Sequence, residues 1–368
     1  MRENIIAKMK STKKVWIVLG VIVVSLIIAC MIVIPPSKGK VQPFLDKEGN
    51  IIEGSISEKL FLDVNDTTLG MFLMAKDETK PVLLFLGGGP GLPEYLLEQE
   101  YPTGLEEEFV VCYLEYRGTS LSYDAKMDVA TMTTEQYIED VVAVSNYLRE
   151  RFGKEKIYVM GHSFGSYIGL KTVHLYPELY HAFIAMSQLC NQRESEYLAY
   201  DYMLEQYKKA GNERMVKKFE KYPIRESDEA YEAYFATSLR DTAMHELGVG
   251  TTRDMNSVIN IFFLSLKCKV YSPIERINIW RGKAFEQKNS QIKAKYFNAF
   301  EEIKEIEVPI YFFAGKYDYT CCYSLQKEYY EQIQAPIKEF YTFENSAHSP
   351  LFEEPEKGME ILRRILGQ

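Results

Sequence analysis

Residues 159–167 read Val-Met-Gly-His-Ser-Phe-Gly-Ser-Tyr, so that Gly161 and Gly165 flank Ser163 symmetrically. The pattern follows an apolar run at 157–160 and opens a stretch with helical periodicity. A strand-to-helix turn sharp enough to expose a serine hydroxyl leaves no room for Cβ atoms at the flanking positions. We therefore predict that Ser163 is a nucleophile. A chance match in a chain with 22 glycines is the alternative, and partners further along the chain argue against it.

The partners lie near the end of the chain. Residues 308–315 form an apolar run closed by glycine, typical of a buried parallel strand, and Asp318 follows in a short loop. His348 stands in the loop after a second predicted strand, 338–343. The chain order Ser163, acid, histidine is the order used when a nucleophile lies between a parallel strand and a helix. We predict Asp318 as the acid and His348 as the base.

The small number of histidines narrows the choice of base. They are His162, His174, His181, His245 and His348. Only His348 follows a late strand, whereas His162 lies inside the turn and His174 on the helix behind it, where hydrogen-bonded structural roles are expected. For the acid, Asp318 has the alternative role of a turn residue, and Glu344 is the rival carboxylate.

These residue types predict acyl transfer. A serine hydroxyl is a weak nucleophile until a neutral imidazole accepts its proton, and a carboxylate holds that imidazole in the required tautomer. Negative charge on the carbonyl oxygen requires preorganised donors, and the amide of Phe164 is one by position. A glycine-rich loop after the apolar run 82–86 is suited to supply the second. Its motif glycines are Gly87, Gly88, Gly89 and Gly91. A phosphate-binding loop is the alternative, but the Gly-Lys-Ser/Thr ending is missing.

The stretch 83–91 resembles the His-Gly-Gly-Pro-Gly motif of the prolyl-iminopeptidase-like branch of α/β-hydrolases. Residues 115–122, Glu-Tyr-Arg-Gly-Thr-Ser-Leu-Ser, resemble that branch's Asp-Gln-Arg-Gly-x-Gly-x-Ser. With the serine motif and the late Asp and His, the resemblance covers most of 55–190 and 305–368. It implies a serine peptidase or hydrolase in which the amide of Gly89, just before the motif's proline, helps to bind the oxyanion.

The chain departs from the family pattern at two places. Gly87 stands where the motif has histidine, and Glu115-Tyr116 replaces Asp-Gln. The aromatic and acidic lid residues that hold a substrate's free amine in family aminopeptidases have no match that aligns. These departures concern the choice of substrate and leave serine hydrolysis as the predicted chemistry.

Residues 15–34 contain no charged side chain and are almost all apolar. A helix of twenty residues crosses a hydrocarbon core of about 30 Å, so we predict a transmembrane anchor. Five basic residues and one acid precede it, which favours a cytoplasmic N-terminus and an extracytoplasmic catalytic domain at the cell membrane. A cleaved signal peptide is the alternative, but the run is long and no small-x-small site precedes Pro35. A lipoprotein cleavage that acylates Cys30 is a second alternative.

Composition and charge fit a globular enzyme beyond the anchor. Charged residues make up 26% and hydrophobic residues 46% of 368 residues. Residues 1–40 carry seven Lys or Arg and one acid, so the rest of the chain carries −15 within the net charge of −9. That balance argues against nucleic acid or an anionic membrane face as a partner. The six cysteines show no metal spacing, and we expect no metal or cofactor. Vicinal Cys321 and Cys322 are either a redox pair or ordinary buried thiols.

Strands alternate with helices along most of the chain, which predicts a doubly wound, mostly parallel sheet with the site at the carboxyl ends of its strands. The predicted strands are 59–65 and 70–75, an antiparallel pair, then 82–86, 109–114, 157–160, 182–186, 310–314 and 338–343. A helix with Thr133 and Gln136 as a capping box separates the second and third parallel strands. Between 190 and 304 the pattern becomes helical throughout, which predicts an inserted lid. Its aromatic residues are either pocket walls or lid core: Tyr197, Tyr200, Tyr202, Phe262, Phe263 and Trp280.

We therefore expect an α/β-hydrolase fold with an inserted helical lid and one N-terminal transmembrane helix. The expected segments are a cytoplasmic basic N-terminus at 1–14, an anchor at 15–34, a linker at 35–45, core at 46–189, lid at 190–304 and core at 305–368. The expected substrate is a small molecule or short peptide cleaved at an ester or amide bond, with aminopeptidase activity implied by the resemblance. The alternatives are a carboxylesterase or lipase-like enzyme and a non-catalytic binding domain on the same fold.

Overall fold

The computed structural model describes residue 21 and residues 35–367. Eight strands form one sheet in the order β1-β2-β4-β3-β5-β6-β7-β8, and the neighbours from β4 to β8 are parallel while β1 and β2 are antiparallel to theirs. The strands are β1 Ile56–Val64, β2 Thr67–Ala75, β3 Val82–Leu86, β4 Val110–Leu114, β5 Ile157–His162, β6 Tyr180–Met186, β7 Ile310–Gly315 and β8 Lys338–Phe343. The predicted mostly parallel sheet is confirmed, and all eight predicted strands are present.

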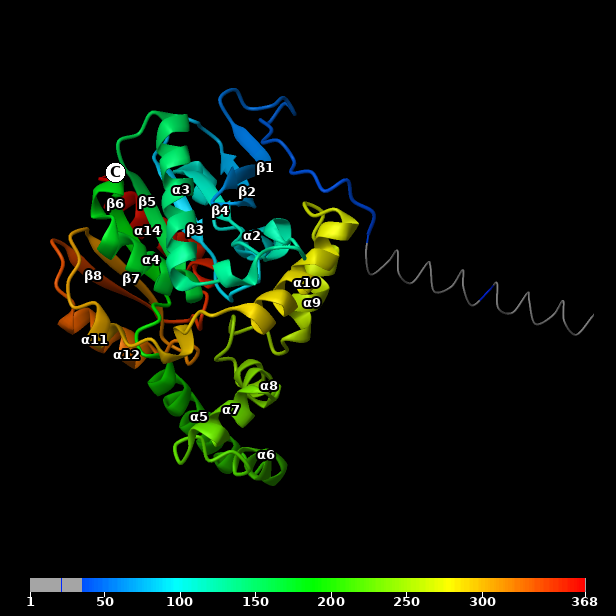
Figure 1. Ribbon diagram of the computed structural model, residues 1–368, viewed down its shortest axis with the longest axis vertical. Coiled ribbons are helices and arrows are strands. Elements are labelled where there is room, and N and C mark those ends of the chain that lie inside the picture. Colours follow the sequence, from blue (N-terminus) through cyan, green and yellow to red (C-terminus); the bar gives the residue numbers. More distant parts are fainter. Residues whose placement is uncertain (1–20, 22–34, 368) are drawn as a thin grey trace, which may run out of the picture.

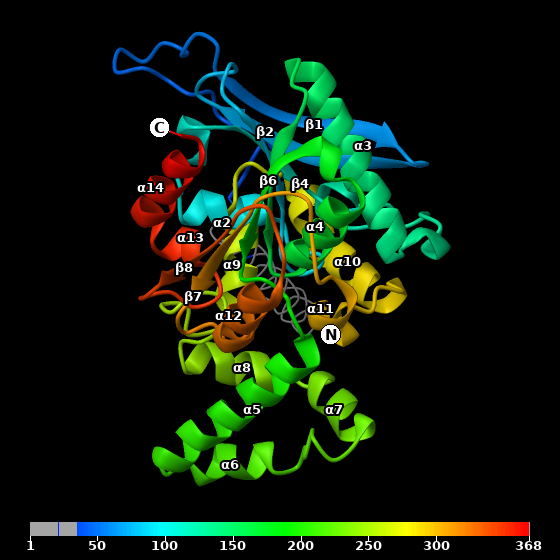
Figure 2. The ribbon, with the colours of Figure 1, turned by 90° about the vertical axis from the view of Figure 1, so that its left-hand side faces the viewer.

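Helices cover both faces of the sheet because both faces are apolar (Figure 2). In β3, Val82, Leu84 and Leu86 belong to one buried cluster, and Leu83 and Phe85 belong to the other. The first cluster lies under α3 Thr134–Phe152, α4 Phe164–Leu175 and α12 Tyr323–Gln332. The second lies under α2 Glu94–Glu100, α13 Pro350–Glu353 and α14 Pro355–Ile365. Short 3-10 helices cover Leu105–Glu107, Ser120–Ser122, Val129–Thr131, Pro177–Leu179 and Ala294–Tyr296.

Helix α3 begins where the sequence predicts. The Thr133 hydroxyl accepts a hydrogen bond from the backbone N–H of Gln136, and Gly153 in a left-handed conformation ends the helix. The predicted apolar face is buried, and it comprises Tyr137, Val141, Val144 and Leu148.

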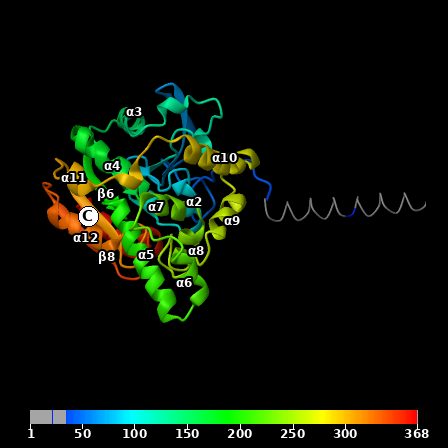
Figure 3. The same cartoon turned by 60° about the horizontal axis from the view of Figure 1, so that its bottom comes forward.

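The segment between β6 and β7 is helical. It comprises α5 Gln192–Lys209, α6 Glu213–Phe219, α7 Asp228–Phe235, α8 Leu239–Glu246, α9 Ile259–Lys267, α10 Pro273–Asn289 and α11 Ala299–Glu302. Helices α5 to α8 enclose an apolar cluster of their own beyond the carboxyl ends of the strands (Figures 2 and 3). Helices α9 and α10 instead pack beside α2 and the second sheet cluster. The segment therefore has two parts: α5 to α8 pack mainly on one another, and α9 and α10 pack on the core of the sheet.

The predicted transmembrane segment 15–34 lies, apart from residue 21, outside the described residues. None of the helices in the described part is long and apolar enough to cross a membrane. The chain from Pro35 onward is held against the domain: the Arg276 guanidinium donates to the Pro35 carbonyl oxygen over 2.7 Å, and the Ser37 hydroxyl donates to the Lys269 carbonyl oxygen. Residues 35–37 are thus fixed beside α9 and α10.

Candidate active site

Ser163 occupies the turn between β5 and α4 with φ 55° and ψ −117°, a strained conformation for a residue with a side chain. A Cβ atom at Gly161 would overlap the carbonyl oxygen of Gly165. One at Gly165 would overlap that of Leu86 on the neighbouring strand. Both glycines are therefore required by space, and they let the turn lift Ser163 above the sheet.

Asp318 and His348 meet beside this turn. His348 Nδ1 lies 3.0 Å from each carboxylate oxygen of Asp318, which follows β7, while His348 follows β8. The carboxylate accepts further hydrogen bonds from Thr320 N–H, Cys321 N–H and the Gln326 side chain. Because Nδ1 donates to Asp318, the other ring nitrogen is left as an acceptor. His348 and Ser163 line one cavity, so the structure brings the three predicted residues together.

The glycine loop passes over the serine. A Cβ atom at Gly88 would lie 3.4 Å from Ser163 Cβ, and Gly89 has a φ of 120° that disfavours any side chain. Phe164 is the first residue of α4, so its N–H has no acceptor within the helix. Gly89 and Phe164 line the same cavity as Ser163, which is the arrangement that a two-donor oxyanion site requires. Of the remaining motif glycines, Gly87 faces Glu94 and Gly91 packs on Lys283.

A buried ion pair that the sequence does not predict links three loops of the site. Glu94 of α2 accepts hydrogen bonds from His162 Nδ1 over 2.8 Å and from Gly88 N–H over 2.9 Å. His162 Nε2 lies 2.7 Å from the carbonyl oxygen of His348. Burial lowers the pKa of His162, but the Glu94 carboxylate, the His348 carbonyl oxygen and the Asp318 charge together raise it, so the pKa lies above its ordinary value. The protonated ring then donates at both nitrogens and fixes the glycine loop and the His348 loop to the turn.

Two cavities open onto Ser163. The smaller, of about 180 Å³, is walled by Leu92, Leu96 and Leu97 from the α2 region and by Ile261 from α9. It is suited to an apolar side chain or acyl group.

The larger cavity, of about 440 Å³, is polar. Glu196 in it is paired with Arg240 through two hydrogen bonds of 2.7 Å. Glu286 of α10 also lines it, is 4% exposed, and has no basic side chain within 4.0 Å among the described residues. Burial raises the pKa of Glu286, and the Ser290 hydroxyl and the Lys283 ammonium only partly offset that rise. The sequence did not single out Glu286. Only the packing of α10 brings this carboxylate to the cavity that contains Ser163.

The six lid aromatics that the sequence offered as pocket walls do not line either cavity at Ser163. Tyr200 belongs to the lid core, and Phe262 and Phe263 are exposed on α9. The one lid aromatic at the larger cavity is Phe235. The interpretation as lid core is thus right for Tyr200 and for Tyr197 and Tyr202, which pack against the same cluster, and none of the six is a wall of the Ser163 cavities.

The five cysteines of the described part are free and buried. Burial raises the pKa of the Cys321 and Cys322 thiols well above the ordinary value. The two adjacent side chains are therefore ordinary buried thiols in this structure.

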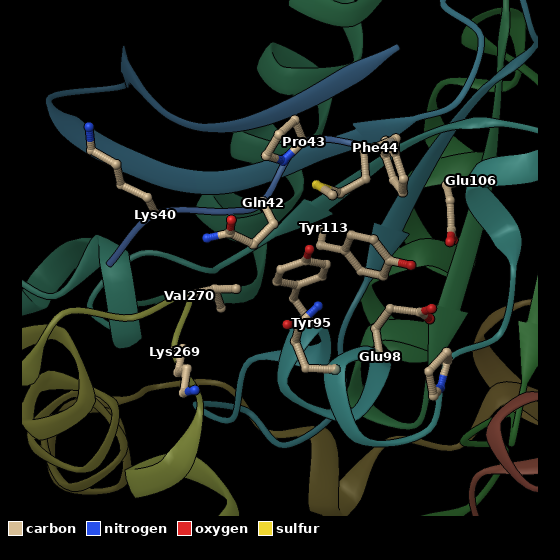
Figure 4. A pocket seen from close by; sticks show the side chains of 13 residues that line it. Lys40, Gln42, Pro43, Phe44, Tyr95, Glu98, Glu106, Tyr113, Lys269 and Val270 are labelled. Atoms are coloured by element: carbon tan, nitrogen blue, oxygen red, sulfur yellow. The ribbon is translucent and has the colours of Figure 1, made fainter. Parts of the chain in front are cut away.

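A further cavity, of about 590 Å³, lies away from Ser163, between the segment 40–44, α2 and residues 269–270 (Figure 4). The aromatic rings of Phe44, Tyr95 and Tyr113 line it together with the Glu98 carboxylate (Figure 4). It contains no part of the Ser163, Asp318 and His348 arrangement.

The fold and the serine turn together define a class. Residues 81–355 match the family model described as alpha/beta hydrolase fold, and the chain belongs to that family of enzymes. It is 31% identical over 306 residues to a probable aminopeptidase, YbaC, of Bacillus subtilis (strain 168), covering 82% of this chain and 94% of that protein.

Similar solved structures extend the comparison at the level of the fold. Proline iminopeptidase of Mycobacterium smegmatis superposes with a TM-score of 0.62 at 14% identity, over 84% of this chain and 98% of that one. Naproxen esterase of Bacillus subtilis gives a TM-score of 0.51 at 15% identity, over 85% and 92%. The shared fold thus accommodates both amide and ester hydrolysis.

Proposed function

We propose that this protein is a serine aminopeptidase that releases an N-terminal residue through an acyl-enzyme. His348 Nε2 accepts the proton of Ser163 as Oγ attacks the carbonyl carbon, and the amides of Phe164 and Gly89 stabilise the oxyanion. His348 then protonates the departing amine. A water molecule, deprotonated by His348, releases the acyl group. The observation that carries this proposal is the Asp318–His348 pair on the same cavity as the strained Ser163 turn.

Glu286 supports the choice of an aminopeptidase. A substrate that is cleaved after its first residue carries an ammonium group close to the scissile carbonyl, and a buried carboxylate without a cationic partner is complementary to it. Glu196 is already paired with Arg240, whereas Glu286 forms no ion pair within 4.0 Å among the described residues and feels Lys283 only at longer range. The similarity to the probable aminopeptidase of Bacillus subtilis points to the same activity.

The test compares aminoacyl-arylamides with matched aryl esters that lack an amine. Ser163→Ala should abolish turnover of both and labelling by a fluorophosphonate probe. Glu286→Gln should lower kcat/KM for the amine substrate about 10- to 100-fold, the value of one charge-assisted hydrogen bond, and leave the ester unchanged. Because burial raises the pKa of Glu286, acidification should neutralise it and reduce kcat/KM more steeply for the amine substrate than for the ester. An unlabelled, folded wild type would instead indicate a binding domain.

Carboxylesterase activity is the second candidate, and the apolar cavity of about 180 Å³ beside Ser163 favours it. It predicts that short-chain aryl esters are hydrolysed faster than any aminoacyl-arylamide. Equal losses of both activities in Glu286→Gln would support this candidate.

We also propose that residues 15–34 anchor the enzyme in the cell membrane with the catalytic domain outside the cytoplasm. The uncharged apolar run and the basic residues before it support this placement. Full-length protein should remain in the membrane pellet after alkaline carbonate extraction, and protease added to intact spheroplasts should digest the catalytic domain. Release by carbonate, or protection of the domain, contradicts it.

A further inference from the structure

Exposed apolar side chains are concentrated on α9 and α10. Five of the fourteen large hydrophobic residues that are exposed in the described part lie there, each between 40% and 58% exposed. We call them the α9–α10 patch: Ile259, Phe262, Phe263, Ile274 and Ile277. Contiguous apolar groups on a soluble surface mark a contact site, whereas isolated ones do not.

The patch is continuous across both helices. Residues 259, 262 and 263 are spaced i, i+3, i+4 on α9, and 274 and 277 are spaced i, i+3 on α10, so each set shares one face. The ring of Trp280 on α10 lies 5.3 Å from that of Phe262, and its indole N–H donates to Ser265 over 2.7 Å. Trp280 therefore joins the two sets.

In the part of the chain that the structure describes, no flexible linker separates the predicted anchor from this surface. The Arg276 guanidinium donates to the carbonyl oxygens of Pro35 and Leu266, over 2.7 Å and 2.9 Å, which fixes Pro35 between the end of α9 and the start of α10. The predicted anchor ends at residue 34, the preceding residue. From Leu266 to Phe262 is one helical turn, about 6 Å. A span that ends at residue 34 therefore brings the patch to the surface of the same bilayer, and Figure 1 shows α9 and α10 on the side where residue 35 begins.

We propose that the α9–α10 patch rests on the lipid bilayer that holds residues 15–34, with Phe262, Phe263 and Trp280 at the level of the lipid headgroups. The inference rests on the anchor proposed above. Apolar contact supplies the attraction, since the chain after residue 40 carries a charge of −15. The exposed lysines near this surface extend toward headgroup phosphates, and Figure 4 shows two of them, Lys40 and Lys269, on the same side of the cavity drawn there.

The contact places the membrane next to the catalytic cavity. Phe262 and Phe263 are exposed on α9, whereas Ile261, the residue before Phe262, is buried and lines the apolar cavity at Ser163. Helix α9 thus separates the bilayer from the site, and the lipid contact fixes the orientation of that cavity relative to the membrane surface.

Trp280 provides the measurement. The chain has two tryptophans, so Trp16→Phe in the full-length protein leaves Trp280 as the single reporter. The protein is reconstituted in phosphatidylcholine vesicles whose acyl chains are brominated near the headgroup or near the chain end. We expect stronger quenching of Trp280 by the shallow bromines. Ile259→Asp/Ile277→Asp should reduce that quenching about twofold or more by moving the patch out of the lipid.

The control pair is Leu175→Asp/Ile337→Asp, which adds the same charge at residues of similar exposure, 58% and 48%, at the end of α4 and before β8. It should leave quenching unchanged. Unquenched Trp280, equal effects of the two pairs, or a chain that does not stay with the vesicles overturns the proposal. Arylamidase activity is measured in the same vesicles: activity without quenching refutes the lipid contact alone, and quenching without activity refutes the catalytic proposal alone.

Discussion

Replacing Asp318 by asparagine tests the catalytic geometry most directly. Oδ1 of Asp318 accepts the backbone N–H groups of Thr320 and Cys321, so the amide oxygen of the new side chain must stay there to satisfy them. Its NH₂ group then takes the Oδ2 position, facing His348 Nδ1 and the Gln326 side-chain NH₂. The new NH₂ group faces the Gln326 donor. His348 Nδ1, which lies 3.0 Å from both carboxylate oxygens, keeps one acceptor and meets one donor unless its proton moves.

The imidazole relieves the conflict by moving its proton to Nε2, and in that tautomer it cannot accept the proton of Ser163. We expect kcat to fall about 10⁴-fold, or about 5.5 kcal/mol in activation free energy. The lost hydrogen bond from Gln326 should cost about 1 kcal/mol of unfolding free energy.

The assay is kcat on the preferred arylamide or ester, with urea unfolding to show that the variant is folded. Glu344→Gln is the matched control, because it removes the rival carboxylate, which is exposed in the His348 loop, and should keep activity within about twofold. The reasoning is refuted if Asp318→Asn retains more than about a tenth of the activity, or if Glu344→Gln loses more than Asp318→Asn does.

Three further variants test the scaffold in urea unfolding. Gly165→Ala places a Cβ against the Leu86 carbonyl oxygen and should lower the free energy of unfolding by about 3 kcal/mol or more. A urea midpoint equal to that of the wild type would contradict this close approach. Burial raises the pKa of Glu98 from 4.5 to about 8, so the folded chain holds a proton that the unfolded chain releases. The free energy of unfolding of the wild type should therefore fall, on the order of 4 kcal/mol, as pH rises from 4.5 to about 8. Glu98→Gln should remove this part of the pH dependence. Asp140→Ala leaves the buried Arg117 guanidinium without its carboxylate partner at 2.6 Å and should cost about 3–5 kcal/mol, whereas a loss below about 1 kcal/mol would show that the pair is dispensable.

The sheet and the three central side chains could be predicted because their signals are local. The spacing of Gly161, Ser163 and Gly165 reflects the close approaches that one turn requires. Asp318 follows the apolar, buried strand β7, and His348 lies in the loop after the last strand, β8. Strand ends were less certain, since β1 extends to Ile56 by pairing along the whole of β2.

The remaining parts of the site depend on contacts between distant residues. Glu94 meets His162 across 68 positions of sequence, and Glu286 reaches Ser163 only through the packing of α10. Neither acid differs in its local sequence from exposed acids nearby. The lid aromatics failed as pocket walls for the same reason, because helical spacing alone does not tell which neighbour an apolar face will meet.

The apolar cluster within α5 to α8 has a consequence for how this enzyme can change. These helices bury their large side chains chiefly against one another, and the sheet retains its two clusters independently of them. They can therefore be exchanged for another helical cap with little change in the sheet, except at the start of α5, where the Ser195 hydroxyl accepts the Cys322 N–H of the Asp318 loop over 2.9 Å. Substitutions in these helices can therefore change substrate preference while the elements that carry Ser163, Asp318 and His348 keep their own packing.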